Sequence, residues 1–310
     1  MSFADMDVGT IWLDGEFVDW DDAQVHVLTH GLHYGTGVFE GVRCYDTPEG
    51  PAIFRWDAHL ERLYQSAKPY GIEIPFDREE LTEATTELIR RDDLKSCYIR
   101  PIAFVGYDRL GLNPAGIPIQ VAIACWPWGA YLGEEAIEEG VDVAVSSWRK
   151  YGSDMIPTNA KTTGPYVNSV LASLEARENG YVEAIVLNQN GTVAEGPGEN
   201  LFLINDGMIH TTGLAEGILD GITRDAVIRI ARDLGYVVND QATISRGELY
   251  TADELFFTGT AAEVTPIRSV DDVTIGAGTK GPVTDEIQST FFDVVERRTD
   301  EYDDWFTYVA

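Results

Sequence analysis

The sequence predicts an α+β protein of two domains. Its 310 residues exceed the usual size of one domain, and 44% hydrophobic with 11% aromatic residues can fill a substantial core. Stretches with strand character and stretches with helical periodicity follow one another irregularly, and hairpin signals recur. This order favours α+β domains, each a mixed sheet or barrel with helices, over a single parallel sheet.

Residues 1–131 are expected to form an N-terminal domain. It begins with two apolar arms around Asp14-Gly15, a dipeptide typical of a hairpin turn. Alternating apolar patterns then predict strands over 37–46, 97–106 and 119–128. Helical apolar patterns predict helices over 57–70 and 77–92.

Residues 132–139 are expected to form an interdomain loop, because the stretch around them starts with loop character and the composition changes after it. The C-terminal domain, 140–310, should begin with a strand at 141–147. Two hairpins are predicted around Asn190-Gly191 and Asp206-Gly207. Three helices are predicted over 166–179, 223–234 and 283–298, and another strand over 254–259.

The charge balance is strongly acidic, with 52 Asp+Glu against 22 Lys+Arg and a formal net charge of −30. The carboxylates are spread along the chain, so the protein should bind neither nucleic acid nor anionic membrane surfaces. Lysine is scarce and arginine supplies most of the positive charge. One hypothesis is adaptation to high intracellular salt, which screens carboxylates; the alternative is an ordinarily acidic protein.

Cysteine usage and the N-terminus indicate a cytoplasmic protein. Cys44, Cys97 and Cys125 have no CxxC spacing and lie in apolar stretches, as expected for reduced core cysteines. The first residues lack a basic region followed by an apolar stretch, and no run of 18 apolar residues occurs. We therefore expect no membrane partner.

Two motifs resemble known sites without their context. Residues 276–281 fit GxGxxG, but the 29 residues that follow leave no room for a dinucleotide-binding unit, so we expect a surface loop. His30 and His33 lack a third ligand at suitable spacing, so no metal site is expected.

Lys161 is the strongest candidate for chemistry. The sequence around it, PTNAKTTGPY, is small and polar and can line a cavity, although a surface lysine is the alternative. A second candidate is Gly221-Ile222-Thr223, directly before an amphipathic helix. Free N–H groups at a helix start favour an anion, although a simple capped helix is commoner.

Nine stretches and one longer signature of the chain match a known family. The stretches are HGLHYGTGVFEGVRCYD, HLERL, SCYIRPIAFVG, PWGAYLG, SSW, IPTNAK, EGPGENLF, DGITRDA and FTGTAAEVTPIRSVD. The signature, in order, comprises Glu195, Asn200-Leu201-Phe202, 209–211 and 219–224. With them the chain resembles, over nearly its full length, the fold-type IV (class IV) pyridoxal phosphate-dependent aminotransferases, a two-domain fold shared with D-amino acid aminotransferase. The resemblance is closest to the branched-chain amino acid aminotransferases.

The resemblance implies pyridoxal 5′-phosphate as cofactor and Lys161 as the catalytic residue that forms a Schiff base with its aldehyde. Glu195 is implied to pair with the pyridine nitrogen, which keeps the ring protonated and able to accept electrons. The remaining implied cofactor contacts are Arg62, Ile222, Thr223 and Thr260 at the phosphate, Tyr166 at the ring oxygen, and Leu219.

Substrate contacts are implied in the same way. They are Phe39, Trp128 and Tyr131 in an apolar side-chain pocket, Tyr98 with the Thr260-Ala261 backbone at the α-carboxylate, and Arg100 at the second carboxylate of glutamate. Tyr34 and Leu112 match residues that reach into a neighbouring subunit, so the smallest expected unit is a homodimer, with a homohexamer as the larger form. Pro197 and Asp220 depart from the family pattern.

The implied reaction transfers the amino group between L-leucine, L-isoleucine or L-valine and 2-oxoglutarate, by a ping-pong mechanism that yields 2-oxo acids and glutamate. The FEGVR and YIRP stretches favour this reaction over those of D-amino acid aminotransferases and aminodeoxychorismate lyases. A non-catalytic scaffold of the same fold is the remaining alternative. The joint presence of Lys161, Glu195, Arg62 and Thr223 argues against it.

Overall fold

The computed structural model describes residues 9–129 and 132–309. The chain divides into two compact units. Unit 1 comprises residues 1–128, 160–164 and 295–310, and unit 2 comprises 129–159 and 165–294. The division is therefore not contiguous, because two later segments join unit 1.

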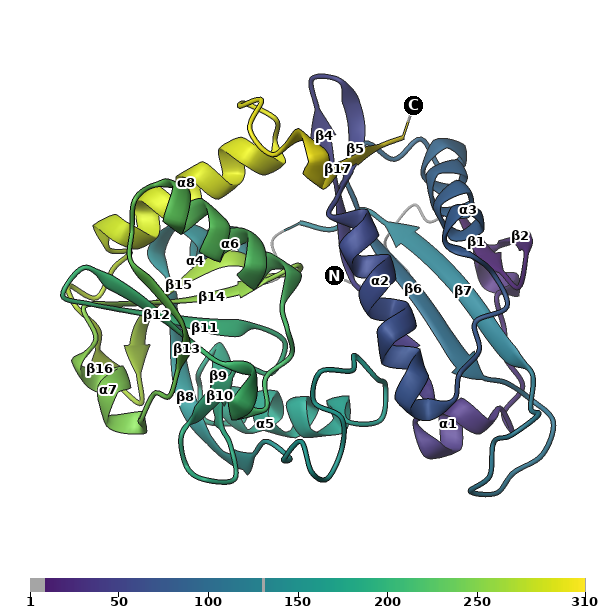
Figure 1. Cartoon of the computed structure of the whole chain (residues 1–310), viewed down its shortest axis with the longest axis horizontal. Helices are drawn as coiled ribbons and strands as arrows, with labels where there is room; N and C mark the ends of the chain where they lie inside the picture. Colours follow the sequence, from purple (N-terminus) through teal and green to yellow (C-terminus); the bar gives the residue numbers. More distant parts are fainter. Residues whose placement is uncertain (1–8, 130–131, 310) are drawn as a thin grey trace. The chain divides into compact units, whose positions relative to one another are not determined.

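Strand pairing explains how these later segments join unit 1. Thr162 forms an isolated antiparallel bridge with Val38. The last strand, β17 (Phe306–Tyr308), pairs with β5 (Gly50–Phe54), and Figure 1 shows its yellow ribbon beside that strand. Residues 134–139, predicted as a loop, instead form the short helix α4 (Glu134–Glu139) between Gly133 and Gly140.

Unit 1 is built on an antiparallel sheet of eight strands in the described residues. Their order is β17-β5-β4-β6-β7-β1-β2, and β3 pairs with β6 beside this path. The strands not yet given bounds are β1 (Thr10–Leu13), β2 (Glu16–Asp19), β3 (Gly37–Phe39), β4 (Val42–Thr47), β6 (Cys97–Val105) and β7 (Ile119–Trp126).

Local sequence explains the first hairpin and the helix starts of unit 1. Asp14 and Gly15 have φ of 51° and 98°, the left-handed pair that a tight hairpin turn requires. Helix α3 (Arg78–Arg91) begins with a capping box in which Asp77 and Glu80 exchange side-chain and backbone hydrogen bonds. Helices α1 (His30–Tyr34) and α2 (Trp56–Ala67) precede it.

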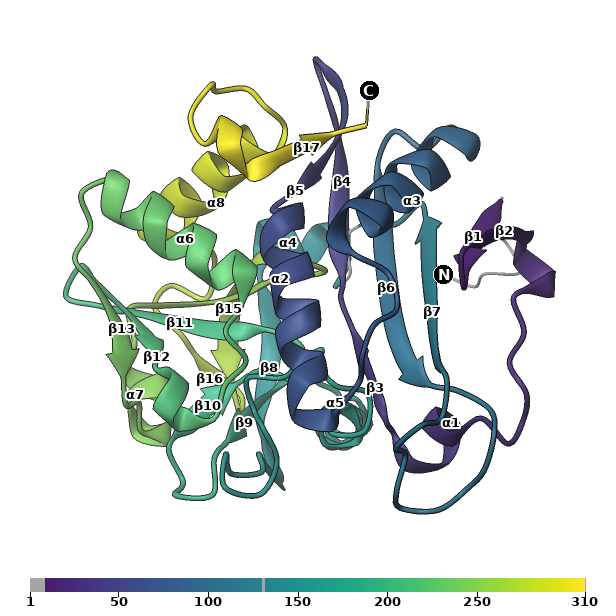
Figure 2. The same ribbon diagram turned by 45° about the vertical axis from the view of Figure 1, so that its right-hand side comes forward.

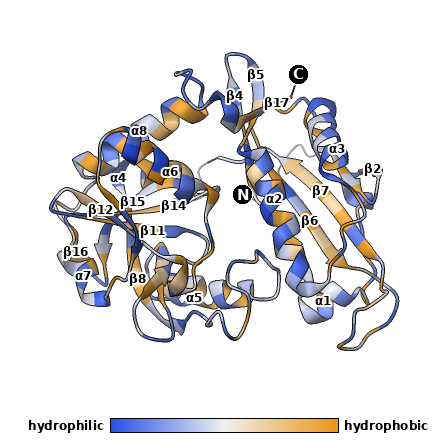
Figure 3. Cartoon of the chain, viewed as in Figure 1, coloured by the Kyte–Doolittle hydropathy of each residue, from blue (hydrophilic) through white to orange (hydrophobic). Residues whose placement is uncertain are grey.

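The core of unit 1 lies between its sheet and helices α2 and α3. Leu60 and Leu63 of α2 and Leu88 of α3 are buried in one cluster with Ile99 of β6 and Ile123 of β7. Figure 2 shows α2 running roughly parallel to β4 and β6, and Figure 3 shows the apolar character of β6 and β7. Helix α2 thereby holds its other residues at fixed positions beside the sheet.

The predicted strand at 37–46 is interrupted. Its two parts, β3 and β4, both pair with β6, but residues 40 and 41 belong to neither strand. The backbone N–H of Glu40 still donates to the carbonyl of Pro101, 2.9 Å away. A Cβ at Gly41 would collide with the hydroxyl of Tyr98, so this position requires glycine.

Unit 2 contains a mixed sheet, which has nine strands in the part of the chain that is described. The order is β10-β9-β8-β15-β14-β11-β12-β13, with β16 beside β15, and three pairs (β8–β9, β15–β8 and β12–β13) are parallel. The bounds are β8 (Val141–Arg149), β9 (Glu183–Leu187), β10 (Val193–Glu195), β11 (Asn200–Asn205), β12 (Met208–Thr212), β13 (Val238–Ala242), β14 (Glu254–Gly259), β15 (Glu263–Val270) and β16 (Val273–Thr274).

Helices α5 (Tyr166–Glu178), α6 (Ile222–Asp233) and α8 (Pro282–Val295) occur where the sequence predicted them. Both predicted hairpins are present as β9–β10 and β11–β12. Helix α7 (Arg246–Thr251) and strand β13 were not predicted, because both are short and largely polar. Residues 276–281 form a loop before α8, as expected. The two mixed or antiparallel sheets with flanking helices confirm the α+β class.

Candidate active site

Lys161 belongs to unit 1 and its backbone is held on both sides. Its N–H donates to the Ser66 hydroxyl on α2 at 2.9 Å. Its carbonyl accepts from the N–H of Phe39, at the end of β3, at 3.1 Å. The lysine is therefore fixed between a helix and a strand, and it is not a surface lysine on a mobile loop.

The amine of Lys161 has an unusual environment. Part of the residue's surface is accessible, but the amine is densely surrounded and lies 5.0 Å from the centre of the Phe39 ring. Burial, followed by the positive charge of Arg62, lowers the pKa of Lys161 from 10.5 to about 8. Roughly a tenth of the amine is then unprotonated at pH 7, and only this form is nucleophilic.

Arg62 lies on α2 and is bound by a buried carboxylate that the sequence did not single out. Its Nε donates to Oε1 of Glu40 at 2.7 Å, and a terminal nitrogen donates to Oε2 at 2.8 Å. His59, one turn earlier on α2, contacts the same Oε2 through Nδ1 at 2.6 Å. The guanidinium is thus held in one plane by a two-point contact.

The charges of this group follow from its contacts. Burial alone would raise the pKa of Glu40, but Arg62 and His59 outweigh it and hold that pKa well below its usual range. Burial lowers the pKa of His59 despite the opposing effect of Glu40. Glu40 is therefore an anion and His59 a neutral donor at physiological pH.

An aromatic wall and a second arginine lie near Lys161. Tyr98 of β6 contacts Trp128 edge-on at 4.4 Å between ring centres, and Arg100 lies 4.9 Å from the Phe39 ring centre. Arg100 also donates to the Tyr98 hydroxyl at 3.3 Å. Its buried Nε has no partner within the described residues. An arginine with an unused buried donor beside aromatic rings suits a carboxylate on an otherwise apolar ligand.

In unit 2, Glu195 ends strand β10 and is 5% exposed. Its Oε1 pairs with the ammonium of Lys150. Its Oε2 accepts from the Asn200 amide at 2.9 Å and from the N–H of Leu219 at 3.0 Å. Both carboxylate oxygens therefore have donors that favour the ionised form.

Asn200 connects this carboxylate to the start of helix α6. Its amide also donates to the Leu219 carbonyl at 3.0 Å. A Cβ at Gly221, the N-cap residue, would collide with the Asn200 side-chain oxygen, so glycine is needed there. Gly221 has no side chain with which to cap this helix, so the helix start at Ile222 and Thr223, both buried, has the backbone N–H groups that can bind an anion.

The other predicted residues of unit 2 lie on nearby loops. Tyr166 begins α5 and lines a pocket of about 250 Å³ together with Pro197, two residues after Glu195. Thr260 and Ala261 form the turn between β14 and β15 and are partly exposed. Gly259, just before them, packs against Gly198 of the Glu195 loop.

Two predicted substrate residues, Leu112 and Tyr34, are not part of either cluster. Leu112 is 90% exposed and Tyr34 is 41% exposed, both in unit 1. Tyr131 lies outside the described residues. His30, which the sequence excluded as a metal ligand, is buried and bonds to the Thr36 hydroxyl and the Gly111 carbonyl near Leu112.

Sequence reasoning missed several residues that hold the predicted ones. Glu40 and His59 lie inside the family stretches HGLHYGTGVFEGVRCYD and HLERL, and both are nearly fully buried polar residues. Ser66 and Lys150 carried no signal that would separate them from other polar residues. Only the structure identifies these four residues: Glu40 and His59 by their burial, Ser66 by its hydrogen bond to Lys161, and Lys150 by its ion pair with Glu195.

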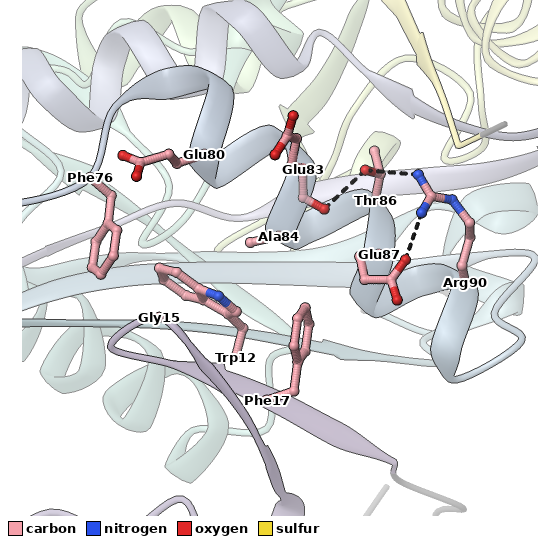
Figure 4. Close-up of a pocket in the computed structure, with 10 residues that line it drawn as sticks. All are labelled: Trp12, Gly15, Phe17, Phe76, Glu80, Glu83, Ala84, Thr86, Glu87 and Arg90. Atoms are coloured by element: carbon pink, nitrogen blue, oxygen red, sulfur yellow. Dashed lines mark hydrogen bonds and ion pairs between the residues drawn. The ribbon is translucent and has the colours of Figure 1, made fainter.

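Unit 1 has a pocket of about 580 Å³ that does not involve Lys161. Figure 4 shows the rings of Trp12, Phe17 and Phe76 facing carboxylates on α3. Glu80 serves the capping box of α3, and Glu87 pairs with arginines of its own helix. These charges therefore already have structural partners, and we assign no chemistry to this pocket.

Metal binding and membrane insertion find no support in the described residues. No group of three or more His, Cys, Asp or Glu side chains there could hold a metal ion. The three cysteines are free and buried. No helix in the same part of the chain is long and apolar enough to cross a membrane.

Comparison with known proteins identifies the family. A family model described as "Amino-transferase class IV" matches residues 37–270. The chain is 50% identical over 309 residues to the branched-chain-amino-acid aminotransferase of Pseudomonas aeruginosa, covering 100% of both chains.

Solved structures agree. The branched-chain amino acid aminotransferase of Escherichia coli is 49% identical with a TM-score of 0.96, covering 98% of this chain and 100% of that one. The enzyme from Thermobaculum terrenum, solved in its PLP-form, is 34% identical with a TM-score of 0.91, covering 98% of this chain and 99% of that one. This chain therefore belongs to the class IV aminotransferases and, within them, groups with the branched-chain amino acid aminotransferases.

Proposed function

We propose that the protein transfers the amino group between L-leucine, L-isoleucine or L-valine and 2-oxoglutarate, with pyridoxal 5′-phosphate as cofactor. The single observation that carries this proposal is the amine of Lys161. It is buried beside Arg62 with a pKa of about 8, in a chain half identical over its whole length to an enzyme of that name. Such an amine suits attack on an aldehyde at neutral pH.

The residues present fit this cofactor. Its aldehyde requires an unprotonated amine, which Lys161 provides. Its phosphate requires donors and positive charge, which Arg62 and the uncapped start of α6 provide. Its ring nitrogen requires an ionised carboxylate, which Glu195 provides. We propose that Tyr166, Leu219 and Thr260 also contact the cofactor.

The bound cofactor supplies a carbonyl that accepts the amino group and a ring that accepts electrons when the Cα proton leaves. Lys161 then acts twice. Its Nζ would hold the cofactor aldehyde, and the same amine, when free, would move the substrate's Cα proton as a general base. Glu195 holds a proton on the ring nitrogen, while Arg62 and Thr223 anchor the phosphate. A 2-oxo acid acceptor such as 2-oxoglutarate would then take up the amino group through the same steps in reverse, which gives a ping-pong cycle.

Substrate specificity follows from the aromatic residues and the arginine near Lys161. Phe39 and Trp128, and by family resemblance Tyr131, surround an apolar side chain. Tyr98 and the Thr260-Ala261 turn bind the α-carboxylate. Arg100 binds the second carboxylate of glutamate through donors that include its unpartnered Nε. One pocket thereby accepts both an apolar and an acidic substrate.

We further propose a homodimer as the smallest active unit, with Tyr34 and Leu112 reaching the neighbouring subunit's site. The 90% exposure of Leu112 supports this, because large apolar side chains are seldom so exposed without a partner. A cytoplasmic location and function at high salt remain proposals that rest on reduced cysteines and a net charge of −30.

The test is an amino-transfer assay with purified protein, 2-oxoglutarate and a panel of amino donors. We expect glutamate to form with L-leucine, L-isoleucine and L-valine and not with D-alanine. Activity with D-alanine alone would instead support the D-amino acid aminotransferase alternative. Bound cofactor without transfer from any donor would favour a lyase.

A further inference from the structure

Resting on the proposed function, we propose that Glu40 and His59 form a positioning pair: they orient Arg62 toward the cofactor phosphate and keep it in register with Lys161. Neither residue is assigned a contact with cofactor or substrate. Their role is to hold the residues that have such contacts.

The first argument is the cost of burying these groups. Glu40 is 1% exposed, His59 is 2% exposed, and Arg62 is also largely buried. A buried ion pair contributes little net stability, because desolvation offsets most of the attraction. Well-packed apolar residues could fill this space at least as well. A buried charged group at a candidate site therefore points to function.

The second argument is geometry. Glu40 binds Arg62 through Nε and one terminal nitrogen, and this fork fixes the plane and direction of the guanidinium. His59 fixes the carboxylate in turn, through Nδ1 at 2.6 Å. The N–H of Gly41 adds a weaker contact at 3.3 Å. Glu40 thus has donors from its own loop and from two positions on α2.

The third argument is the connection to Lys161. His59, Arg62 and Ser66 are spaced three and four residues apart on α2, so they share one face of the helix. Ser66 holds the N–H of Lys161, and Phe39, next to Glu40, holds its carbonyl. The same helix face and the same loop therefore fix both the arginine and the lysine. Displacing Glu40 would change the position of one relative to the other.

The charges around this pair also matter for the prediction. Arg62 and Lys161 supply positive charge near Glu40, and Arg100 acts on Lys161. If Glu40 acted only by neutralising Arg62, its removal would strengthen phosphate binding. If it positions Arg62, its removal weakens phosphate binding although the net positive charge rises. The sign of the change therefore separates the two roles.

The experiment measures the affinity of the full-length apoprotein for pyridoxal 5′-phosphate and for pyridoxal, which lacks the phosphate, by absorbance titration. The variants are Glu40→Gln, His59→Phe and His59→Asn, whose amide can replace the Nδ1 donor. Glu61→Gln is the control, because Glu61 is the exposed neighbour of Arg62 on α2 and pairs with Arg78. Thermal unfolding of each apoprotein checks that it folds.

We expect Glu40→Gln to weaken pyridoxal 5′-phosphate binding by about tenfold or more, the usual scale for a hydrogen bond to a charged group, with little change for pyridoxal. His59→Phe should act in the same direction, and His59→Asn should restore most of the affinity. Glu61→Gln should change neither.

Equal losses for both ligands would reduce the pair to a structural role, and unchanged or tighter phosphate binding would overturn the proposal. If Glu40→Gln does not fold, the difference between His59→Phe and His59→Asn decides. Failure of the proposed function would look different, because the wild-type protein itself would not bind pyridoxal 5′-phosphate.

Discussion

The Lys161 cluster and the Glu195 cluster are assembled in opposite ways. Lys161 meets Glu40 and Arg62 only through the fold of unit 1, and Ser66, which holds its N–H, lies 95 residues earlier in the chain. Asn200 and Leu219, which hold Glu195 in unit 2, lie 5 and 24 residues after it, and Lys150 lies 45 residues before it. Both clusters contain buried charge, but the partners of Lys161 and Glu40 lie farther along the chain than most of those of Glu195. We expect substitutions in the two to change different properties.

The largest effect should come from Glu195→Gln. A neutral amide cannot hold the proton on the ring nitrogen, so we expect the transfer rate to fall by about a hundredfold or more while the cofactor stays bound. Steady-state rates with L-leucine, together with the cofactor absorbance, check this. Glu178→Gln, at the exposed end of α5, is the control. A rate close to wild type would remove Glu195 from the mechanism.

A pH profile tests the Lys161 cluster. Because the pKa of Lys161 is lowered to about 8, the rate at which pyridoxal attaches to the apoprotein should rise about tenfold per pH unit below pH 8 and level off above it. Between pH 6 and pH 9 this amounts to roughly a hundredfold. A rate that continues to rise toward pH 10.5 would mean that burial does not affect the amine.

Arg100→Met should separate the two substrate classes. Loss of the guanidinium removes the partner of the second carboxylate, so we expect KM for 2-oxoglutarate to rise by about ten- to a hundredfold. The KM for L-leucine, which has no second carboxylate, should change far less. Equal changes for both substrates would assign Arg100 to the α-carboxylate or to the fold.

Asn200→Ala should have a smaller effect, on cofactor affinity, and it compares the Glu195 cluster with the Lys161 cluster. Asn200 joins Glu195 to the segment before α6, so its loss should loosen both the ring contact and the phosphate contact. We expect the affinities for pyridoxal 5′-phosphate and for pyridoxal to fall together, by about tenfold. Glu40→Gln, in contrast, is expected to weaken only the binding of pyridoxal 5′-phosphate. If Asn200→Ala also weakened only that ligand, the expected difference between Asn200 and Glu40 would be contradicted.

The sequence predicted the parts that depend on local signals. The turn at Asp14-Gly15 and the helix expected over 77–92 follow from residue type and spacing, and both are present. Glu195 was singled out by family resemblance alone. Residues 40 and 41, which separate β3 from β4, were predicted as part of one continuous strand because apolar residues flank them. The partners of the buried Glu40 carboxylate lie on α2 and leave no signal in this stretch of the sequence. Short polar elements such as α7 were missed for lack of periodicity.

The two later segments of unit 1 could not be predicted either. Residues 160–164 join through one bridge to Val38 and hydrogen bonds to Ser66 and the β3 region, none of which leaves a pattern in the sequence. Strand β17 is three residues long and pairs with β5 from far along the chain. Lys161 was a candidate from the small and polar residues around it in the sequence, and the family resemblance implied its role. The residues that surround it in space were identified only from the structure.

The most direct test of the whole account is the absorbance spectrum of the purified protein in high salt, before and after addition of L-leucine, alongside Lys161→Ala. We predict a cofactor band in the visible range that shifts when L-leucine donates its amino group to the wild-type protein. In Lys161→Ala the band should be absent or unresponsive. A protein without the band, or a variant that responds like wild type, would contradict the assignment of Lys161 and the cofactor.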